Sequence, residues 1–435
     1  MLKSTLRFLL TLSLSLINVS AGAQDYAPLG GEDLEGPSPL AGERRPFGSH
    51  LVSYVDGTIL PQKSQAELDN QTKQFYNKWK AKFVAQGCGT GRYYVLPGGV
   101  GGGMDPNSIS VSEGHGFGMV ITAYMAGYDA NAKKIFDGMY WFFRDHPSVY
   151  SPHLMAWNQV KGCGNVDGDD TSSATDGDLD IAYALLLADR QWGSSVPGGI
   201  NYLAEAKKVI NAILTKEIHP TSNTVLLGDW AADSGASYLN GTRTSDFMTD
   251  HFKSFARVGN VTRWNAVLNK SYSISKSLQS GYSASTGLLP DFVEDATSSP
   301  RPARSGYLEG STDGAYSYNA CRAPWRLAMD FFVNGNVEAK NIVQKMNKFI
   351  RSKTNGNPSQ IRDGYRLNGT VIGSYPSMAF VAPFAVGAMV DSSNQAWLNS
   401  LWDTIVSTSI TSGGYYENSI KMLNMIVLSS NYWKP

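Results

Sequence analysis

Apolar residues recur at helical spacing along most of the chain from Ser64 onward. Residues three and four apart share one face of a helix, so this periodicity predicts helices. The twelve predicted helices cover residues 64–85, 112–128, 131–146, 172–192, 202–216, 245–258, 261–279, 319–334, 337–353, 377–390, 394–409 and 416–429. Long loops rich in Gly, Ser and Asp occur at 87–111, 147–175, 218–244, 281–318 and 354–375.

The stretch 172–192 departs from the amphipathic pattern of an ordinary surface helix. It begins as a polar turn with Asp176, Asp178 and Asp180, and continues into eight consecutive apolar residues, IAYALLLA. A helix that is apolar all round is expected to be buried on every side. Thr175 or Asp176 can cap its start, where carboxylates lie at the positive end of the helix. One capping residue with two solvated acids is the alternative interpretation.

Twelve helices joined by alternating short and long connections favour six helical hairpins. This pattern predicts an all-α protein, an (α/α)6 barrel with inner helices that are apolar all round and amphipathic outer helices. Functional residues are expected at the end where the long loops gather. No charge run, low-complexity tract or clear repeat indicates a second folded domain, so residues 61–435 are interpreted as one domain.

The N-terminus has the pattern of a secretory signal. Lys3 and Arg7 precede a short apolar run at 8–17, and small residues at 21–23 form a cleavage site before Gln24. The apolar run is too short to span a bilayer. We therefore expect a signal peptide at 1–23, an N-terminal extension rich in Pro, Gly and charge at 24–60, and secretion to the cell exterior or the periplasm.

The composition of the chain limits the kinds of partner that we expect. The 435 residues carry 37 Lys and Arg against 37 Asp and Glu, which gives no reason to expect a nucleic acid or a membrane as partner. The six His show no metal-ligand spacing, so no metal and no cofactor is expected, and we expect a monomer. Export permits disulfides. Cys88 and Cys163 both lie in GCG loops and form the favoured pair, whereas Cys321 in a predicted helix is expected to be a buried thiol.

The motif SEGHGFGM at 112–119 offers a candidate acid, Glu113, at the start of an apolar helix. Three glycines within it disfavour a helix, so they indicate close approach of another backbone or of a ligand. A carboxylic acid at an apolar rim has a raised pKa and can act as a general acid. The alternative is a simple capping interaction, with Ser112 as the cap.

A second motif, YLEGSTDGAYSYNACRAPWR at 307–326, combines a loop with a helix start. The loop carries Glu309 and Asp313, and the helix carries Arg322 and Arg326, four residues apart and suited to pair with carboxylates. Aromatic residues in predicted loops can stack on sugar rings, although each taken singly is more typical of a core. They are Trp157, Trp192, Trp230, Tyr307, Tyr316, Tyr318, Tyr375, Tyr415 and Tyr416.

Several acids, loop aromatics and export together indicate an enzyme that cleaves polysaccharides, because glycoside hydrolysis needs one protonated and one ionised carboxyl group. Three motifs in order resemble glycoside hydrolase family 8. They are SEG-x-G-x-GM at 112–119, ATDGD followed by the apolar run at 174–192, and NACR-x-PWR at 319–326. The similarity runs from about residue 80 to the C-terminus. The resemblance implies an (α/α)6 catalytic domain and inverting hydrolysis of β-1,4-linked glycans.

Residue by residue, the resemblance implies that Glu113 is the proton donor and that Asp176 holds the distorted sugar in the central subsite. Many family members have a base Asp where this chain has Asn319, and an amide cannot accept the proton of water. A branch of the family with Asn there takes its base from the preceding loop, in a stretch that Leu308-Glu309-Gly310 resembles. We therefore expect Glu309 as the base.

Two other loop acids, Asp313 and Glu294, are alternative bases, while Asp178 and Asp180 are interpreted as structural. The residues expected to bind substrate are Trp157, Trp230, Tyr307, Tyr318, Asn319, Arg322, Tyr375 and Tyr416.

The branch implied by the resemblance includes chitosanases and β-glucanases. Chitosan carries cationic amines, so acids in the loops favour an endo-acting chitosanase. These acids are Asp167, Asp169, Asp170, Glu294, Asp295 and Asp313. A β-glucanase of lichenase or cellulase type and a xylanase are the alternatives within the family. A non-catalytic carbohydrate-binding protein is the alternative from another class, and it would not need Glu113, Asp176 and Glu309 together.

Overall fold

The computed structural model describes residues 42–99, 104–194, 198–410 and 413–435. The expected signal peptide at 1–23 lies outside these residues. Within them the α-helices are α1 (Gln65–Phe83), α2 (Ser112–Tyr124), α3 (Ala132–Asp145), α4 (Thr175–Trp192), α5 (Tyr202–Lys216), α6 (Ala236–Leu239), α7 (Thr249–Ala256), α8 (Val261–Gly281), α9 (Ala323–Asn334), α10 (Val337–Lys353), α11 (Met378–Ala388), α12 (Gln395–Ser407) and α13 (Tyr415–Leu428). Each of the twelve predicted helices is confirmed, with ends shifted by a few residues, and the short α6 was not predicted.

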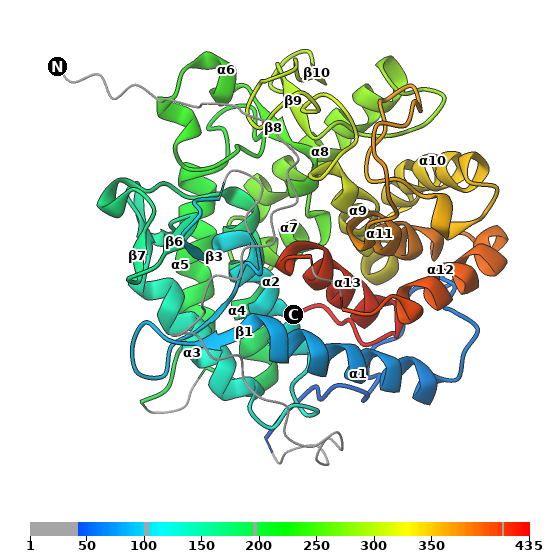
Figure 1. The fold of residues 1–435 in the computed structure, drawn as a ribbon. Coiled ribbons are helices and arrows are strands. Elements are labelled where there is room, and N and C mark those ends of the chain that lie inside the picture. The colour runs from blue at the N-terminus through cyan, green and yellow to red at the C-terminus, as the bar shows by residue number, and fades with distance from the viewer. Residues whose placement is uncertain (1–41, 100–103, 195–197, 411–412) are drawn as a thin grey trace.

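The long helices form two concentric rings. The inner ring closes through contacts between successive members, in the order α2, α4, α7, α9, α11, α13 and back to α2. Each inner helix also packs on an outer one, and these outer helices are α3, α5, α8, α10, α12 and α1. In Figure 1, α1, α10 and α12 lie at the rim around α11 and α13. The predicted (α/α)6 barrel is thus confirmed.

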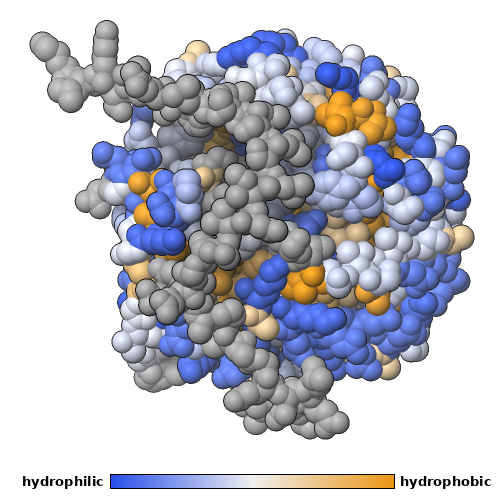
Figure 2. Space-filling model, in the orientation of Figure 1, coloured by the Kyte–Doolittle hydropathy of each residue, from blue (hydrophilic) through white to orange (hydrophobic). Residues whose placement is uncertain are grey.

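Burial follows the two rings. Every residue of α11 is buried, and α4 is buried along its length except at Asp189 and Arg190. The outer helix α10 instead buries one stripe, with Ala339, Ile342 and Val343 at helical spacing. In the space-filling view the outer helices α1 and α12 present a mainly hydrophilic surface (Figure 2). The apolar runs in the sequence therefore mark the inner ring.

The long connections lead into the N-terminal ends of the inner helices and carry short antiparallel strands. The strands are β1 (Val84–Gln86), β2 (Tyr93–Val95), β3 (Ser108–Val111), β4 (Pro147–Ser148), β5 (Ser151–Met155), β6 (Asn158–Val160), β7 (Gly164–Asn165), β8 (Thr242–Arg243), β9 (Phe292–Glu294) and β10 (Arg301–Pro302). They pair as β1-β2, β3-β6-β7, β4-β5 and β8-β9-β10. Segments of two to five residues are too short to give a periodic signal, so the sequence did not predict them.

The described part of the N-terminal extension crosses the opposite end of the barrel. Its backbone N–H groups donate to carbonyl oxygens at the C-terminal ends of inner helices: Phe47 to Ala126, Val55 to Phe332, and Ile59 to Met389. The extension lies over the surface as expected, and it covers the end remote from the long loops. The site must therefore be sought at the N-terminal ends of the inner ring.

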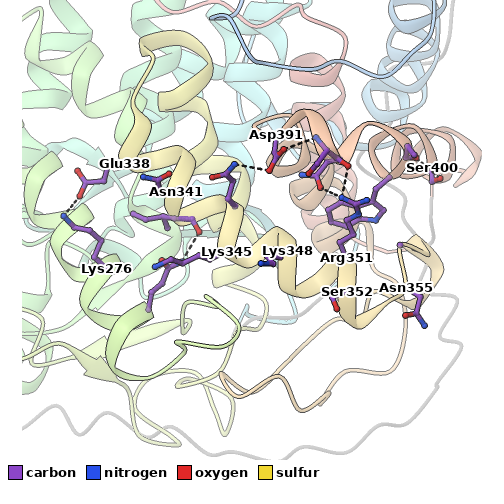
Figure 3. Close-up of a pocket in the computed structure, with 18 residues that line it drawn as sticks. Lys276, Glu338, Asn341, Lys345, Lys348, Arg351, Ser352, Asn355, Asp391 and Ser400 are labelled. Atoms are coloured by element: carbon purple, nitrogen blue, oxygen red, sulfur yellow. Dashed lines mark hydrogen bonds and ion pairs between the residues drawn. The ribbon is translucent and has the colours of Figure 1, made fainter.

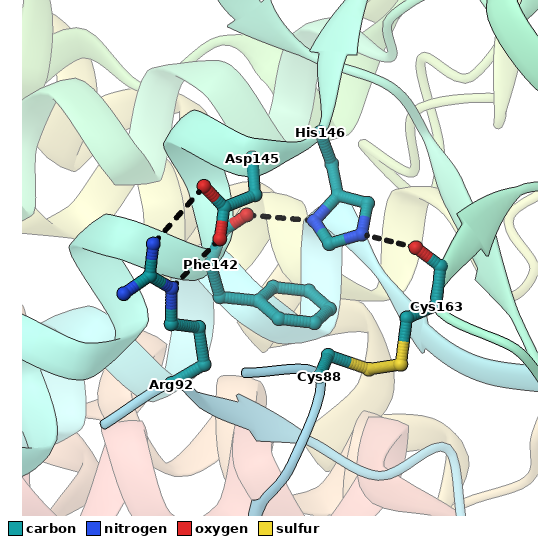
Figure 4. The surroundings of a disulfide bond; sticks show 6 residues. All are labelled: Cys88, Arg92, Phe142, Asp145, His146 and Cys163. Carbon is teal, nitrogen blue, oxygen red and sulfur yellow. Dashed lines mark hydrogen bonds and ion pairs between the residues drawn. A yellow bond between two sulfur atoms is a disulfide. The ribbon is translucent and has the colours of Figure 1, made fainter. Parts of the chain in front are cut away.

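Cys88 and Cys163 form the expected disulfide, with their Cα atoms 5.4 Å apart (Figure 4). The ring of His146 lies beside the bond, with Nε2 3.2 Å from the Cys163 carbonyl oxygen. Cys321 is free and buried, as predicted. The disulfide joins the β1-β2 connection to the loop that follows α3.

The predicted cap of α4 is wrong, and so is the alternative interpretation of Ser112 as the cap of α2. The N-cap of α4 is Ala174, and the N-cap of α2 is Val111, and neither helix start has a side-chain cap. The Thr175 hydroxyl instead donates to the Leu226 carbonyl oxygen, 2.8 Å away. Within the described residues, no helix is both long and apolar enough to cross a membrane.

Candidate active site

The first turns of α2 and α4 bring two carboxyl groups together. Glu113 lies at the start of α2 and Asp176 at the start of α4, and Arg322 comes from the 3-10 turn Ala320–Arg322 that precedes α9. Arg322 Nη1 donates to Asp176 Oδ2 at 2.9 Å and also to Glu113 Oε2. Three stretches far apart in the sequence thus meet at one end of the barrel.

Glycines allow this close approach. A Cβ on Gly177 of α4 would lie 2.6 Å from the Ser112 carbonyl carbon and hydroxyl oxygen, and a Cβ on Gly116 of α2 would lie 2.9 Å from the Gly177 carbonyl oxygen. Real Cβ atoms do not come so close to backbone atoms, so α2 and α4 touch backbone to backbone. Gly116 and Gly177 therefore serve the packing of α2 on α4. The same contact fixes the spacing of Glu113 and Asp176.

Glu113 is held as a protonated acid at neutral pH. Burial raises the pKa of Glu113 to about 8, the Arg322 charge opposes this rise, and the neighbouring Asp176 charge adds to it. Tyr415, the first residue of α13, donates its hydroxyl to Glu113 Oε1 at 2.8 Å. A carboxyl group in this state can donate a proton to a leaving oxygen.

Asp176 is held as a carboxylate. Burial alone would raise its pKa, but the charges of Arg243 and Arg322 outweigh burial and lower it. Arg243 Nη2 lies 3.3 Å from Asp176 Oδ1, and the Gly177 backbone N–H donates to the same oxygen at 3.0 Å. The site thus keeps one carboxyl group protonated and its neighbour ionised.

Glu309 approaches the same arginines from the loop between β10 and α9. The residue lies on an exposed loop, but its carboxyl group turns inward, and Oε2 accepts a hydrogen bond from Asn319 Nδ2 at 2.8 Å. The surrounding protein raises the pKa of the Glu309 carboxyl group, and Arg243 and the Asn319 hydrogen bond limit that rise. Among the described residues, Glu309 has a hydrogen-bond partner at only one of its two carboxyl oxygens.

A hydrogen-bonded chain connects Glu309 to the other two acids. Asn319 Oδ1 accepts from Arg322 Nη2 at 3.0 Å and from Arg243 Nη1 at 3.4 Å. Glu309 is therefore separated from Glu113 by Asn319 and Arg322 and does not touch it. Two carboxyl groups held apart in this way can serve as a separate acid and base, and they do not share a proton.

The two alternative bases have other partners. The carboxylate of Asp313 accepts the backbone N–H groups of Leu308, Glu309 and Gly310, at 2.7, 3.1 and 2.8 Å. Glu294 is buried in ion pairs with Arg301 and Arg304. Asp313 thus shapes the loop that presents Glu309, and neither acid is placed to activate water.

Asp291 fixes the other side of the same loop. Its Oδ1 accepts the backbone N–H groups of Ser317, Asn319 and Ala320, at 2.9, 3.2 and 2.6 Å. Burial raises the pKa of Asp291 to about 8, although these hydrogen bonds favour its charged form. Both ends of the loop from Leu308 to Ala320 are therefore held by carboxyl groups that cradle backbone N–H groups.

The aromatic residues expected to bind substrate have different surroundings. Trp157 and Trp230 are half-buried in the loops before α4 and after α5. Tyr318 and Tyr375 are 38% and 48% exposed, and their hydroxyl groups lie 2.9 Å apart. Tyr416 is half-buried, with the Arg322 guanidinium carbon 5.6 Å from its ring centroid.

The expectation for Tyr307 is wrong. Its side chain is buried between Tyr238 and Phe292, and its hydroxyl donates to the Ser237 carbonyl oxygen at 3.0 Å. A Cβ on Gly241 would clash with the same hydroxyl. Tyr307 belongs to a small second core under the loops and offers no face to a sugar.

Asp178 and Asp180 are structural, as interpreted from the sequence. Asp178 accepts the backbone N–H of Met155 at 2.8 Å. Asp180 Oδ1 accepts from Arg326 Nη1 at 2.9 Å and lies 3.0 Å from His251 Nε2. The predicted pairing of Arg322 and Arg326 with carboxylates is confirmed, at two levels of the barrel.

Sequence reasoning missed Arg243 and Asp291, and it did not place Tyr415 beside an acid. Tyr415 had been noted only as one of several loop aromatics. Arg243 and Asp291 lie in long loops without a periodic pattern, so no local signal pointed to them. Their proximity to the carboxyl groups depends on the closure of the barrel.

A hollow lies away from these groups, on the outer surface between α8, α10 and α12 (Figure 3). Some of its charged groups have close partners: Lys276 pairs with Glu338, and Arg351 Nη1 donates to Asn394 Oδ1 at 3.0 Å. None of the acids described above lines it. In the part of the chain that the structure describes, no group of three or more His, Cys, Asp or Glu could hold a metal ion.

One end of this (α/α)6 barrel holds a protonated glutamate, an ionised aspartate and a second glutamate. These are the fold and the acid groups of a glycoside hydrolase. The sequence family described as "Glycosyl hydrolases family 8" matches residues 63–429. The chain belongs to glycoside hydrolase family 8.

Relatives and solved structures agree with this assignment. The chain is 48% identical to a beta-glucanase of Niallia circulans over 395 residues, 91% of this chain and 92% of that protein. It is 40% identical to an endoglucanase of Bacillus sp. (strain KSM-330) over 407 residues, 92% of this chain and 84% of that protein. The apo structure of a beta-1,3-1,4-glucanase from Paenibacillus sp. X4 superposes with a TM-score of 0.84 and 47% identity, covering 90% of this chain and 100% of that one.

Proposed function

We propose that the protein is an inverting endo-β-glucanase that hydrolyses β-1,4 linkages in β-1,3-1,4- or β-1,4-glucan. The observation that carries the proposal is the separation of roles among three carboxyl groups. Glu113 is protonated, Asp176 is ionised, and Glu309 stands apart from both behind Asn319 and Arg322. Inverting enzymes need an acid and a base that stand apart, at roughly 6.5–9.5 Å, to leave room for a water molecule.

In the proposed reaction Glu113 protonates the oxygen of the leaving sugar. Asp176, fixed by Arg243 and Arg322, holds the distorted ring in the central subsite and stabilises the positive charge that develops on it. Glu309 takes the proton of the water that attacks from the opposite face. Arg322 helps to position all three acids, because it contacts Glu113 and Asp176 directly and Glu309 through Asn319.

The substrate is proposed from the relatives and from the loop acids. The relatives described above are named for glucans, and chitosanase action finds no support among them. Three of the six acids that favoured chitosan in the sequence have partners: Glu294 and Asp295 pair with Arg301, and Asp313 binds backbone N–H groups. Such acids offer little negative charge to a cationic polymer.

Initial rates on barley β-glucan, carboxymethylcellulose, chitosan and xylan test the substrate directly. We expect release of reducing ends on the two glucans at rates at least tenfold above those on chitosan and xylan. Faster hydrolysis of chitosan or xylan would overturn the proposed substrate. Binding of glucan without release of reducing ends would favour a carbohydrate-binding protein instead.

The roles of the acids are tested by Glu113→Gln and Glu309→Gln, each isosteric and unable to exchange the required proton. Loss of either catalytic group should lower kcat by about 10²–10⁴-fold. A Glu309→Gln enzyme with near-full activity would remove Glu309 as the base.

We also propose that the protein is exported, to the cell exterior or the periplasm. The motif at residues 1–23 supports this location. N-terminal sequencing of protein collected outside the cytoplasm should begin at Gln24, whereas an uncleaved cytoplasmic chain would refute it.

A further inference from the structure

The connection between α10 and α11 carries an acid that no step of the proposed reaction uses. Asp363 is half-buried at the start of a short hairpin that returns to Tyr375. Its Oδ1 accepts the backbone N–H groups of Ser374 and Tyr375, at 2.6 and 3.0 Å. Its Oδ2 accepts the hydroxyl of Tyr318, from the loop before α9, at 2.9 Å. One carboxyl group thus closes the hairpin and binds a side chain from another loop.

A glycine lets the two ends of this hairpin meet. The Gly364 carbonyl oxygen accepts the N–H groups of Ile372 and Gly373, at 3.0 and 3.2 Å. A Cβ on Gly373 would lie 2.5 Å from the Asp363 carbonyl carbon and 2.3 Å from Asp363 Oδ1. Real Cβ atoms do not come so close to backbone atoms, so glycine at this position allows the carboxyl group to reach the next two N–H groups.

The hydrogen bonds of the two tyrosines have a defined direction. Tyr318 has a single O–H, which it donates to Asp363. The Tyr318 oxygen lies 2.9 Å from the hydroxyl of Tyr375, so Tyr375 is the donor in that bond. Asp363 therefore holds Tyr375 in two ways, directly at its backbone N–H and through Tyr318 at its hydroxyl.

The Tyr318 ring is also fixed from other sides. It packs edge-on against Phe380 of α11, with ring centroids 5.2 Å apart and an interplanar angle of 87°. The Tyr416 hydroxyl donates to the Tyr318 carbonyl oxygen. The next residue, Asn319, binds Glu309 at 2.8 Å. The two exposed tyrosines thus form an ordered aromatic surface next to the residue that holds the expected base.

We propose that Asp363 is a positioning residue, which holds Tyr318 and Tyr375 as a fixed aromatic platform for a sugar unit of the substrate. The assignment of this platform to substrate rests on the proposed function. An exposed tyrosine that is free to turn loses this freedom when a sugar packs on it, and the loss opposes binding. Asp363 orders both side chains beforehand, so it favours substrate binding and leaves the chemical step unchanged.

Asp363→Ala tests the proposal, because it removes the three hydrogen bonds and keeps both rings. With two tyrosines to order on binding, KM should rise roughly tenfold while kcat stays within about twofold. An unchanged KM, or a loss confined to kcat, would overturn the positioning role.

The substrate for this measurement is whichever of barley β-glucan, carboxymethylcellulose, chitosan and xylan the wild type hydrolyses fastest. An error in the proposed glucan substrate therefore does not affect the test of Asp363. If the wild type hydrolyses none of the four, the proposed function fails, and dissociation constants for the same polysaccharides replace KM.

Asp391→Ala is the matched control. Asp391 also accepts a backbone N–H of its own loop, that of Ser393 at 2.9 Å, and a side-chain N–H, that of Gln344 at 3.1 Å. It lies at the hollow on the outer surface, away from the acids (Figure 3). A fall in Tm common to both variants measures the loosening of a loop, whereas KM should rise only in Asp363→Ala. A similar rise in KM in both variants would contradict the proposal.

Two further variants separate the hydroxyl contact from the fold of the hairpin. Asp363→Asn keeps an oxygen for the N–H groups and offers an NH₂ group to the Tyr318 oxygen, so KM should stay within about threefold of the wild type. Tyr318→Phe keeps the ring and removes the hydroxyl. It should raise KM in the wild type but have little further effect in Asp363→Ala, because both changes remove the same hydrogen bond. Multiplied effects on KM would show that Asp363 does not act through Tyr318. An unchanged KM in Tyr318→Phe would overturn the positioning role even if Asp363→Ala did not fold.

Discussion

At the scale of single residues, the protonation states of the acids depend on how strongly the charges of Arg322 and Arg243 act on each of them. Both arginines act on Asp176 and keep it ionised, whereas for Glu113 burial prevails over Arg322 and raises the pKa. In the proposed reaction Glu309 must be ionised to take a proton, so we expect its raised pKa to set the acid limb of the pH profile. Glu113 must be protonated, so its pKa of about 8 sets the alkaline limb of kcat.

Tyr415→Phe tests the assignment of the alkaline limb to Glu113. The hydroxyl of Tyr415 donates to Glu113 and favours its charged form, so removing it raises the pKa of Glu113. The alkaline limb of kcat should move to higher pH, while the acid limb stays in place. The pH dependence of kcat on barley β-glucan measures both limbs, and a shift of the alkaline limb to lower pH would contradict the assignment.

Asp313→Asn tests whether the three backbone hydrogen bonds to Asp313 position Glu309. An asparagine presents an NH₂ group to at least one of the N–H donors, so the loop must shift. We expect kcat to fall by roughly 100-fold with little change in KM, since a displacement of about 1 Å is enough for such a loss. Asp295→Asn is the control, because Asp295 is exposed with φ 52°, which Asn tolerates. Equal kcat in both variants would exclude the positioning role.

At the scale of elements, the contact of α2 with α4 sets the spacing of Glu113 and Asp176. Gly177→Ala places a methyl group against Ser112, where both backbone and side chain are too close. Overpacking of this kind costs about 1–3 kcal/mol of unfolding free energy, and it should lower kcat because the two acids move apart. Gly281→Ala at the end of α8, with nothing within 4 Å of the added methyl, should leave both unchanged. Urea unfolding and kcat measure the two effects together.

Helices could be predicted from the sequence because their signal is local. The all-apolar run 181–188 marked α4 as an inner helix, and helical spacing located α10 with its correct ends. Short strands such as β8, of two residues, carry no period, so they were missed. The burial of Tyr307 could not be predicted either, because it depends on contacts with Gly241, in another loop, and with Phe292 of strand β9.

The candidate site could be predicted in part. Glu113, Asp176 and Glu309 were found through their motifs, and the structure places all three around Arg322 and its hydrogen-bond partner Asn319. The pKa values could not be predicted, because they depend on burial and on arginines from other segments. Asp313 illustrates what the sequence could not predict. Its position in the loop suggested an alternative base, and only its three hydrogen bonds with backbone N–H groups show that it holds the loop in shape.

At the scale of the whole molecule, the disulfide ties two of the connections at the site end. Cys88 and Cys163 are 75 residues apart, and a cross-link over such a loop stabilises the fold by about 4 kcal/mol. Cys88→Ser with Cys163→Ser should lower the urea midpoint accordingly, and reduced wild-type protein should match the double variant. An unchanged midpoint would contradict a stabilising role.

In the proposed reaction the barrel holds the acid and the base on opposite sides of the substrate, and inversion requires this separation. Proton NMR of barley β-glucan hydrolysis, recorded within the first minutes, reports the anomeric configuration of the new reducing end before mutarotation. The separated carboxyl groups predict that the α-anomer appears first and the β-anomer grows in later. A β-anomer formed first would show retention and would contradict the roles assigned to Glu113 and Glu309.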